Sequence, residues 1–337
     1  MSAGARQTAS AATSPSGVTV AGVGSKVTSI SWVVAGGLAA WAAARVTAAD
    51  RVRRSETPAV LLLSFTPQVA AAAPWAALGL RLARRRGPAA TAALAAAALG
   101  LVVGSRGIPR PQPAACGPVL RVLTVNMYRG RADAEVIVAR VRQADADVLF
   151  LQELTADAVP RLKQAGLEDL MPHTQLEPRV GSRSSGIYSR FPLSEGPRVA
   201  PVRAAQPTAL LELPSGKALE LVCVHTAAPA SRRGGAVLWR EELAVLPPPG
   251  ELPRVLAGDF NASLDHAAFR DVLRLGYADA ALQAGKALAP TWGPPGKGAV
   301  FTLDHVLVDR RCAVLACSVH VVPGSDHRAV YAEIQLA

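Results

Sequence analysis

The stretch Arg254-Val-Leu-Ala-Gly-Asp-Phe-Asn-Ala262 is the most informative part of this chain. Its apolar run, 255–257, predicts a buried strand, which Gly258 ends just before Asp259 and Asn261. Because residues i and i+2 of an extended chain point to the same side, the carboxylate and the carboxamide are expected to face one cavity. A plain Asp-x-Asn turn is the alternative interpretation. The pair of oxygen-bearing side chains suits a hard cation or a phosphate group.

From Val119 onward, short β-branched runs alternate with helical segments. Strands are predicted at 119–126, 147–151, 185–189, 208–213, 218–225, 253–258, 303–308, 313–321 and 328–334. Helices are predicted at 132–144, 155–165, 233–246 and 264–275. The alternation predicts a mixed β-sheet with helices outside it.

Polar residues stand at the ends of several other predicted strands. They are Asn126, Gln152-Glu153, His225, Asp304-His305 and Asp326-His327. Singly, each has a structural interpretation: Glu153 could cap the next helix, His225 could be a core histidine, and Asp326-His327 could be turn residues. Together, the carboxylate and amide oxygens favour Mg²⁺ or Mn²⁺ over zinc, and two histidines could divide the proton transfers of phosphoester hydrolysis.

The ordered set of motifs resembles the endonuclease/exonuclease/phosphatase superfamily, which includes DNase I-like nucleases, sphingomyelinases and inositol-polyphosphate phosphatases. The matching motifs are Thr124-Val-Asn126, Leu151-Gln-Glu153, Ser185-Gly-Ile-Tyr-Ser-Arg-Phe-Pro192, Val224-His225-Thr226, Gly258-Asp-Phe-Asn261, Leu303-Asp-His305 and Ser325-Asp-His327. The resemblance covers about residues 119–337. It implies an α/β (α+β) four-layer sandwich, in which helices flank two mixed β-sheets, and a Mg²⁺- or Mn²⁺-dependent hydrolase of phosphate esters.

The resemblance also implies a role for each side chain. Those implied to bind the cation are Asn126, Glu153 and Asp326. Those implied to be catalytic are His225, Asp259, Asn261, Asp304 and His327. Asp259 would orient or activate the attacking water, Asn261 would hold a phosphate oxygen of the substrate, and Asp304 would pair with His327. His225 matches the second histidine of the nuclease branch.

Two departures from the nuclease pattern bear on the substrate. Nuclease relatives commonly carry an acid before the strand that here reads Ser184-Ser-Gly-Ile187, and Thr302 stands where an Arg is common. Phosphoesterase chemistry is therefore favoured over DNA hydrolysis. Among the loop arginines Arg179, Arg183, Arg232 and Arg233, we take Arg183 as the candidate substrate contact, with simple solvation as the alternative for all four.

The first 104 residues contain three apolar stretches, at 27–44, 58–80 and 88–103. Their lengths predict a three-helix transmembrane anchor over 27–104, after a disordered segment 1–26 and before a Pro-rich linker, 105–118, and the domain 119–337. A soluble Ala-rich helical hairpin is the alternative. The loop 81–86 has four arginines and no acid, which places it in the cytoplasm and the domain 119–337 outside the cell.

This organisation is similar to the membrane-anchored bacterial branch that includes VanJ-type proteins associated with teicoplanin resistance. The similarity implies a multi-pass, monomeric cell-membrane protein whose catalytic face lies outside the cell and whose candidate substrate is a lipid-linked phosphate, such as an undecaprenyl pyrophosphate. Two alternatives remain: an extracytoplasmic nuclease that cleaves DNA, and an inactive scaffold that binds phosphorylated ligands.

Charge and cysteine content add little to this hypothesis. The formal net charge is +11, but much of the basic excess flanks the apolar stretches, so a nucleic-acid partner is possible without being favoured. The four cysteines have no zinc-site spacing. Cys223 is expected to be a buried thiol, and strand alternation argues against a Cys312–Cys317 disulfide.

Overall fold

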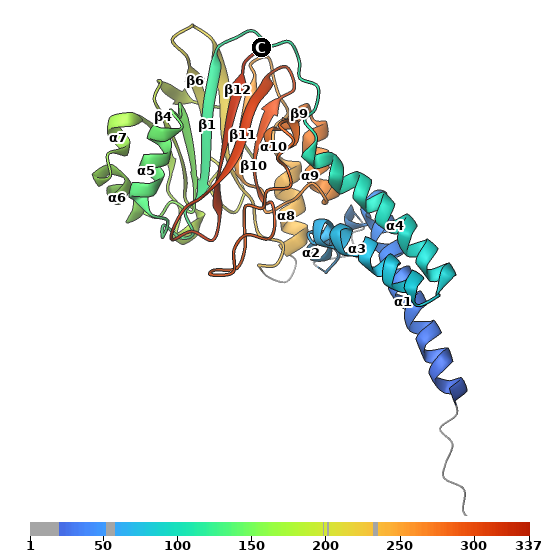
Figure 1. Cartoon of the computed structure of the whole chain (residues 1–337). Helices are drawn as coiled ribbons and strands as arrows, with labels where there is room; N and C mark the ends of the chain where they lie inside the picture. Colours follow the sequence, from blue (N-terminus) through green and yellow to red (C-terminus); the bar gives the residue numbers. More distant parts are fainter. Residues whose placement is uncertain (1–19, 52–57, 198, 201, 232–234) are drawn as a thin grey trace, which may run out of the picture.

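Two six-stranded β-sheets form the body of the protein, in a computed structural model that describes residues 20–51, 58–197, 199–200, 202–231 and 235–337 (Figure 1). The first sheet has the strand order β11-β12-β1-β2-β4-β3. Its strands are β1 (Val119–Asn126), β2 (Val148–Gln152), β3 (His173–Glu177), β4 (Ser185–Ser189), β11 (Ala313–Val321) and β12 (Arg328–Gln335). The second has the order β5-β6-β7-β8-β10-β9. Its strands are β5 (Leu193–Glu195), β6 (Thr208–Glu212), β7 (Ala218–His225), β8 (Arg254–Asp259), β9 (Tyr277–Asp279) and β10 (Asp304–Asp309).

Both sheets are mixed and both are covered by helices. Among the described strands, β1 pairs in parallel with β2 and β7 with β8, and the other pairs are antiparallel. The helices are α5 (Ala134–Gln143), α6 (Ala158–Gln164), α7 (Leu167–Leu170), α8 (Gly235–Ala244), α9 (Ala267–Arg274) and α10 (Ala280–Gln283). The predicted sandwich of two mixed sheets flanked by helices is confirmed, and each predicted strand lies within one residue of an observed strand at either end.

Strand β2 illustrates why an unbroken apolar run forms a central strand here. Val148 and Phe150 belong to the core between the two sheets, whereas Leu149 and Leu151 belong to the core under α5 and α6. Because both faces of the strand are buried, both sets of alternating side chains must be apolar. The outer face of the second sheet is covered in the same way, with Trp239 of α8 and Phe269 of α9 packed into its core.

The amino-terminal helices form an arm that extends from one side of the sandwich (Figure 1). They are α1 (Val20–Thr47), α2 (Pro58–Leu63), α3 (Thr66–Leu82) and α4 (Arg86–Gly104), with 3₁₀ turns at Ala49–Arg51 and Ser105–Gly107. In the described residues, two helical segments are long and apolar enough to cross a membrane, Ser29–Thr47 and Arg86–Gly107. The predicted span 58–80 is not one helix, because α2 ends at Leu63 and α3 is a separate helix of 17 residues. Three transmembrane helices are therefore not confirmed.

The predicted disordered segment, 1–26, and the predicted linker, 105–118, also differ in part from expectation. Helix α1 begins at Val20, inside the segment 1–26 that was predicted to be disordered, and residues 1–19 lie outside the described part of the chain. Within 105–118, Arg106 is buried against Asp265, and the Gln112 side chain accepts a hydrogen bond from the backbone N–H of Val314. The arm and the sandwich are thus joined through packed polar contacts. All four cysteines are free thiols, including Cys312 and Cys317.

Candidate active site

Sheet topology brings the polar strand ends together at one edge of the sandwich. The parallel pair β1–β2 aligns Asn126 with Gln152, and the parallel pair β7–β8 aligns His225 with Asp259. Antiparallel β10 begins at Asp304, which is aligned with Asp259. Because parallel strands end at the same edge of a sheet, residues far apart in the sequence meet here without any long loop.

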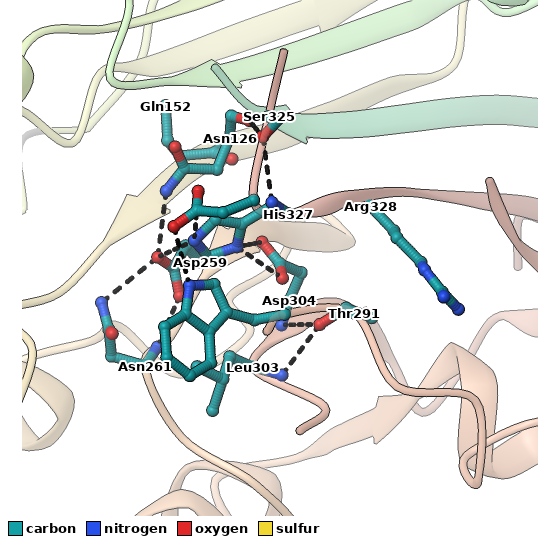
Figure 2. Close-up of polar contacts among 12 residues, drawn as sticks. Asn126, Gln152, Asp259, Asn261, Thr291, Leu303, Asp304, Ser325, His327 and Arg328 are labelled. Carbon is teal, nitrogen blue, oxygen red and sulfur yellow. Dashed lines mark hydrogen bonds and ion pairs between the residues drawn. The ribbon is translucent and has the colours of Figure 1, made fainter. Parts of the chain in front are cut away.

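Asp259 lies at the centre of this group and is buried (Figure 2). Its Oδ1 accepts a hydrogen bond from the backbone N–H of Asn261 at 2.8 Å, and its Oδ2 accepts from the side-chain amides of Asn126 at 3.1 Å and Asn261 at 3.2 Å. Burial raises the pKa of Asp259 to about 7, against the opposing effect of the nearby His327 imidazole. The carboxylate is fixed in position and is a stronger base than an exposed aspartate.

The backbone around Asp259 explains the residues that flank it. Gly258 has a φ of +147°, and a Cβ there would lie 2.0 Å from the carbonyl oxygen of Val224 on the neighbouring strand. Only glycine fits this close approach of β8 to β7. Asn261 and Glu153 also have positive φ angles, +47° and +54°, which is uncommon for residues with a side chain and recurs at functional sites.

His327 and Asp304 form a buried pair beside Asp259. The Nδ1–H of His327 donates to Asp304 at 2.9 Å, which leaves Nε2 facing Asp259 Oδ2 at 3.7 Å and Asp326 Oδ1 at 3.9 Å (Figure 2). Burial lowers the pKa of His327, but the carboxylates of Asp304 and Asp259 outweigh it and raise the pKa to about 10. The imidazole is therefore a fixed hydrogen-bond donor with cationic character.

Glu153 and Asp326 supply two carboxylates to the same cavity. Glu153 Oε2 accepts from the backbone N–H of Arg129 at 2.7 Å, and Asp326 Oδ2 accepts from the indole N–H of Trp292 at 3.1 Å. Burial raises the pKa of Glu153, and the charge of Asp326 raises it further. The second oxygen of Asp326, Oδ1, is buried and has no hydrogen-bond partner among the described residues. Two desolvated carboxylates with an unsatisfied oxygen fit a hard divalent cation, which would relieve their mutual repulsion.

Two other observations bear on which residues could hold that cation. Ligand atoms of Asp259, Asp304 and His327 lie within 4.8 Å of one another, a distance at which three residues could share a metal ion. These atoms are already hydrogen-bonded, however, since His327 donates to Asp304 and the Asn126 amide donates to Asp259, and the bonds explain the short distances without an ion. The Nδ2 group of Asn126 donates a hydrogen bond to Asp259, and its Oδ1 accepts one from the backbone N–H of Tyr128 at 3.0 Å. A carbonyl oxygen has two lone pairs, so Asn126 Oδ1 can still accept one further partner.

His225 differs from His327 in its surroundings. Burial lowers its pKa to about 4, and the nearby His327 lowers it further. Its Nε2 lies 4.0 Å from Glu153 Oε1, and its buried Nδ1 has no partner in the part of the chain that the structure describes. The segment Ser184-Ser-Gly-Ile187 contains no acid, so it supplies no carboxylate to this Nδ1. His225 is a neutral imidazole in the active-site wall.

These residues surround a cavity of about 580 Å³. Seven of the predicted site residues line this cavity: Glu153, Arg183, His225, Asp259, Asn261, Asp326 and His327. Asn126 and Asp304 lie directly behind Asp259 and His327. Of the other loop arginines, Arg179 bonds Glu177 on the surface, and Arg232 and Arg233 lie outside the described residues.

Several lining residues were missed by sequence reasoning. Arg129 and Arg203 stand at the cavity alongside Arg183, and Trp292 and Phe301 form an aromatic part of its wall. Leu61, Ser64 and Phe65 reach the cavity from the amino-terminal arm. The sequence allows Trp292, in Pro290-Thr-Trp-Gly293, either to line the mouth of the site or to pack, whereas nothing in the hydropathy of the arm marks Leu61 or Phe65 as site residues.

The sandwich fold and this site define a metal-dependent phosphoester hydrolase. The chain belongs to the endonuclease/exonuclease/phosphatase family, whose model matches residues 123–327. Members of this family typically depend on a divalent cation and include nucleases and phosphatases. No curated protein sequence matches the chain.

Solved structures share the fold at low sequence identity. An endonuclease/exonuclease/phosphatase from Beutenbergia cavernae is 22% identical, with a TM-score of 0.51 over 65% of this chain and 72% of that one. A humanized D. rerio TDP2 is 19% identical, with a TM-score of 0.51 over 64% and 98% of the two chains. An endonuclease/exonuclease/phosphatase from Bacteroides vulgatus is 15% identical, with a TM-score of 0.50 over 65% and 100%. At these identities the likeness extends to the fold alone.

Proposed function

We propose that this protein is a Mg²⁺- or Mn²⁺-dependent phosphoesterase, anchored in the cell membrane, that hydrolyses a phosphate ester or pyrophosphate on the outer face of the membrane. The observation that carries the proposal is one cavity in which fixed Asp259 faces the His327–Asp304 pair and two further carboxylates, Glu153 and Asp326. An in-line displacement at phosphorus requires these parts: a base, a donor to the phosphoryl oxygens, and donors for a cation.

Each side chain takes a distinct part in this hydrolysis. Glu153, Asp326 and the carbonyl oxygen of Asn126 would hold the cation, which when bound neutralises charge on the phosphoryl oxygens. Asp259 orients the attacking water and accepts its proton, as the raised pKa of its carboxyl allows. The Nε2–H of His327 donates to the phosphoryl oxygens, and the Asn261 amide joins it when substrate takes the place of one of its two present acceptors, Asp259 Oδ2 at 3.2 Å or the Thr226 carbonyl oxygen at 2.9 Å.

His225 and Arg183 act at the edges of the reaction. His225, uncharged at neutral pH, packs beside Glu153 and offers one imidazole nitrogen for proton transfer with the substrate. Arg183 lies on the cavity wall, where its guanidinium would contact an anionic substrate. The polar floor of the cavity, formed by Glu153, Asp259, Asp326 and His327, thus lies beside the basic side chain of Arg183.

Cation binding gives the first prediction. Replacing Glu153 with glutamine should weaken Mg²⁺ and Mn²⁺ binding by at least ~10-fold, because one of two adjacent carboxylates loses its charge. Calorimetric titration of each ion into the purified protein measures the change. Glu168→Gln, at an exposed surface carboxylate paired with Lys163, is the matched control and should bind the ions as the unaltered protein does. Equal affinity in the Glu153 variant would place the cation elsewhere.

The exposed apolar surface of the arm supports the membrane part of the proposal. Trp75, Leu82, Leu94 and Leu101 are each about three-quarters exposed, and water would make that exposure unfavourable. Figure 1 shows the α3–α4 turn at the ends of α3 and α4 that lie away from the sandwich, with α1 extending beyond it. With α1, α3 and α4 as spans, the basic loop 81–86 lies in the cytoplasm and the sandwich outside. A reporter fused after residue 337 tests that orientation: activity of a periplasm- or exterior-specific reporter supports it, and cytoplasmic activity contradicts it.

The similarity to VanJ-type proteins supports a lipid-linked phosphate as substrate and a part in teicoplanin resistance, and a monomer is sufficient because one chain supplies the whole site. Extracytoplasmic DNA cleavage is the alternative activity. Plasmid DNA, sugar phosphates and polyprenyl pyrophosphates should be assayed side by side with Mg²⁺. Preferred hydrolysis of the pyrophosphates supports the proposal, whereas plasmid nicking that weakens steeply with salt would indicate a nuclease. Ligand binding without any product would indicate an inactive scaffold.

A further inference from the structure

One wall of the active-site cavity comes from the amino-terminal arm. Leu61 of α2 and Ser64 and Phe65 of the turn into α3 line the same cavity as Asp259 and His327. Nearly two hundred residues separate these two groups in the sequence. The arm therefore forms part of the catalytic cavity in addition to any role as an anchor.

Several contacts fix this wall in place. Val60 is 0% exposed and belongs to the core under α8 and α9, and its carbonyl oxygen lies 2.8 Å from Nε2 of His266. The Phe65 ring packs edge-on against Phe301 with ring centroids 4.8 Å apart. The Gln68 side chain donates to the Val300 carbonyl at 3.0 Å. A buried anchor residue, an aromatic contact and two polar contacts hold the turn against the sandwich.

The wall leaves apolar surface uncovered beside the polar floor. Leu61 is 37% exposed and Phe65 43%, although their neighbour Val60 is fully buried. Leu62, also on α2, is 52% exposed, so the apolar surface continues from the cavity onto the arm. The basic side chains Arg129 and Arg183 line the same cavity. One region of the cavity thus matches an anionic phosphoryl group, and an adjoining region matches an apolar substituent.

We infer, on the basis of the proposed phosphoesterase activity, that Leu61 and Phe65 are specificity-determining residues that accept a flexible alkyl chain esterified to the phosphate. The phosphoryl group occupies the polar floor, and the chain lies over Leu61 and Phe65 and continues along α2. An alkyl chain fits better than a compact polar group because Leu61 and Phe65 line the cavity while the next residue of α2, the exposed Leu62, lies outside it. Polar phosphoesters leave this wall exposed to water and gain nothing from it.

Two synthetic diesters with one leaving group test the inference, methyl and octyl p-nitrophenyl phosphate. In both, water attacks phosphorus, the bond to the nitrophenyl oxygen breaks, and the products are p-nitrophenolate, a proton and methyl or octyl phosphate. The full-length protein is assayed in dodecyl maltoside, a detergent without phosphate, with Mg²⁺ present. The quantity compared is the ratio of kcat/KM for the octyl ester to kcat/KM for the methyl ester.

The unaltered protein should prefer the octyl ester, and Phe65→Ala should lower this preference about tenfold, because kcat/KM for the octyl ester falls by more than kcat/KM for the methyl ester. Leu61→Ala should lower it in the same direction and serves as a second variant if Phe65→Ala does not fold. Leu78→Ala removes a side chain of similar exposure on α3 that does not line the cavity, and it should keep the full preference.

The outcomes separate this inference from the proposed function. Hydrolysis of both esters with no octyl preference, or with a preference that neither variant changes, would overturn the inference and leave the phosphoesterase proposal intact. Hydrolysis of neither ester would count against the proposed function itself. An equal loss for both esters in Phe65→Ala would assign the arm a structural role in place of substrate selection.

Discussion

Replacing Asp259 with asparagine should lower kcat about a thousandfold while the protein remains folded. Asparagine keeps the shape of the side chain and can still accept from the backbone N–H of Asn261, but it cannot take a proton from the attacking water. Its NH2 group would face the donor amides of Asn126 and Asn261, and His327 would lose one of its carboxylate partners, so a lower melting temperature of a still folded protein is expected. Steady-state hydrolysis of a p-nitrophenyl phosphodiester measures kcat, and a thermal melt verifies folding.

Asp147→Asn is the matched control for that experiment. Asp147 is also a buried aspartate beside a strand of the sandwich, but it accepts from the backbone N–H of Arg121 and does not line the cavity. Its replacement should leave kcat close to that of the unaltered protein. If Asp259→Asn retained the same kcat as Asp147→Asn, the base would have to be another group, and the proposed role of Asp259 would fail.

The grouping of the candidate residues at one edge of the sandwich could be predicted because their positions follow from strand chemistry. A polar residue directly after an apolar strand, as at Asn126, His225 and Asp259, must emerge at the sheet edge, and parallel pairing brings such edges together. The pairing of Asp304 with His327 was implied by the resemblance to the superfamily, and the structure has that hydrogen bond. What local pattern cannot give is the order of the strands, which joins these ends into one cavity.

The strands that were missed share a position in the fold. β3, β5 and β9 are each at the edge of a sheet. β3, His-Thr-Gln-Leu-Glu, is partly exposed and lacks the apolar run of a central strand, so the sequence does not predict a strand there. Edge strands are short and polar because only one neighbour pairs with them and solvent faces the other side. Their hydropathy therefore resembles that of loops.

The junction between arm and sandwich could not be predicted for a different reason. Leu61, Val60 and Phe65 are apolar whether they face lipid, a protein core or a substrate, so hydropathy gives one signal for three environments. The break between α2 and α3 has a local cause in Pro67, which lies in the first turn of α3, where proline begins a helix and does not continue one, and the docking of Val60 under α8 and α9 is a tertiary contact beside it. The apolar stretch 58–80 is thus divided between α2, which packs against the sandwich, and α3, which belongs to the arm.

Replacing Asp265 with alanine should produce the largest loss of stability. Its carboxylate is fully buried and accepts from Arg45 Nε at 2.7 Å and Arg106 Nη1 at 2.9 Å, two arginines at the sandwich ends of α1 and α4. Their guanidinium groups are themselves largely buried, so the variant leaves two desolvated cations unpaired. The cost is about 3–5 kcal/mol, which should lower the melting temperature of the full-length protein by roughly 10 °C.

An exposed ion pair at the same junction supplies the control. Asp271 contacts Arg51 and Arg274, but its side chain and that of Arg51 are half exposed, so Asp271→Ala should cost at most about 1 kcal/mol. A triple replacement, Arg45→Met, Arg106→Met and Asp265→Leu, removes the carboxylate together with both arginines that contact it, leaves Arg270 with Asp50 as its nearby carboxylate, and should recover most of the melting temperature. Equal melts for the Asp265 and Asp271 variants would mean that the arm does not depend on this contact. Residues 110–337 alone lack Arg45, Arg106 and Val60. If the expected difference between the variants is found, the isolated domain should therefore be less stable than the full-length protein and have an incomplete cavity.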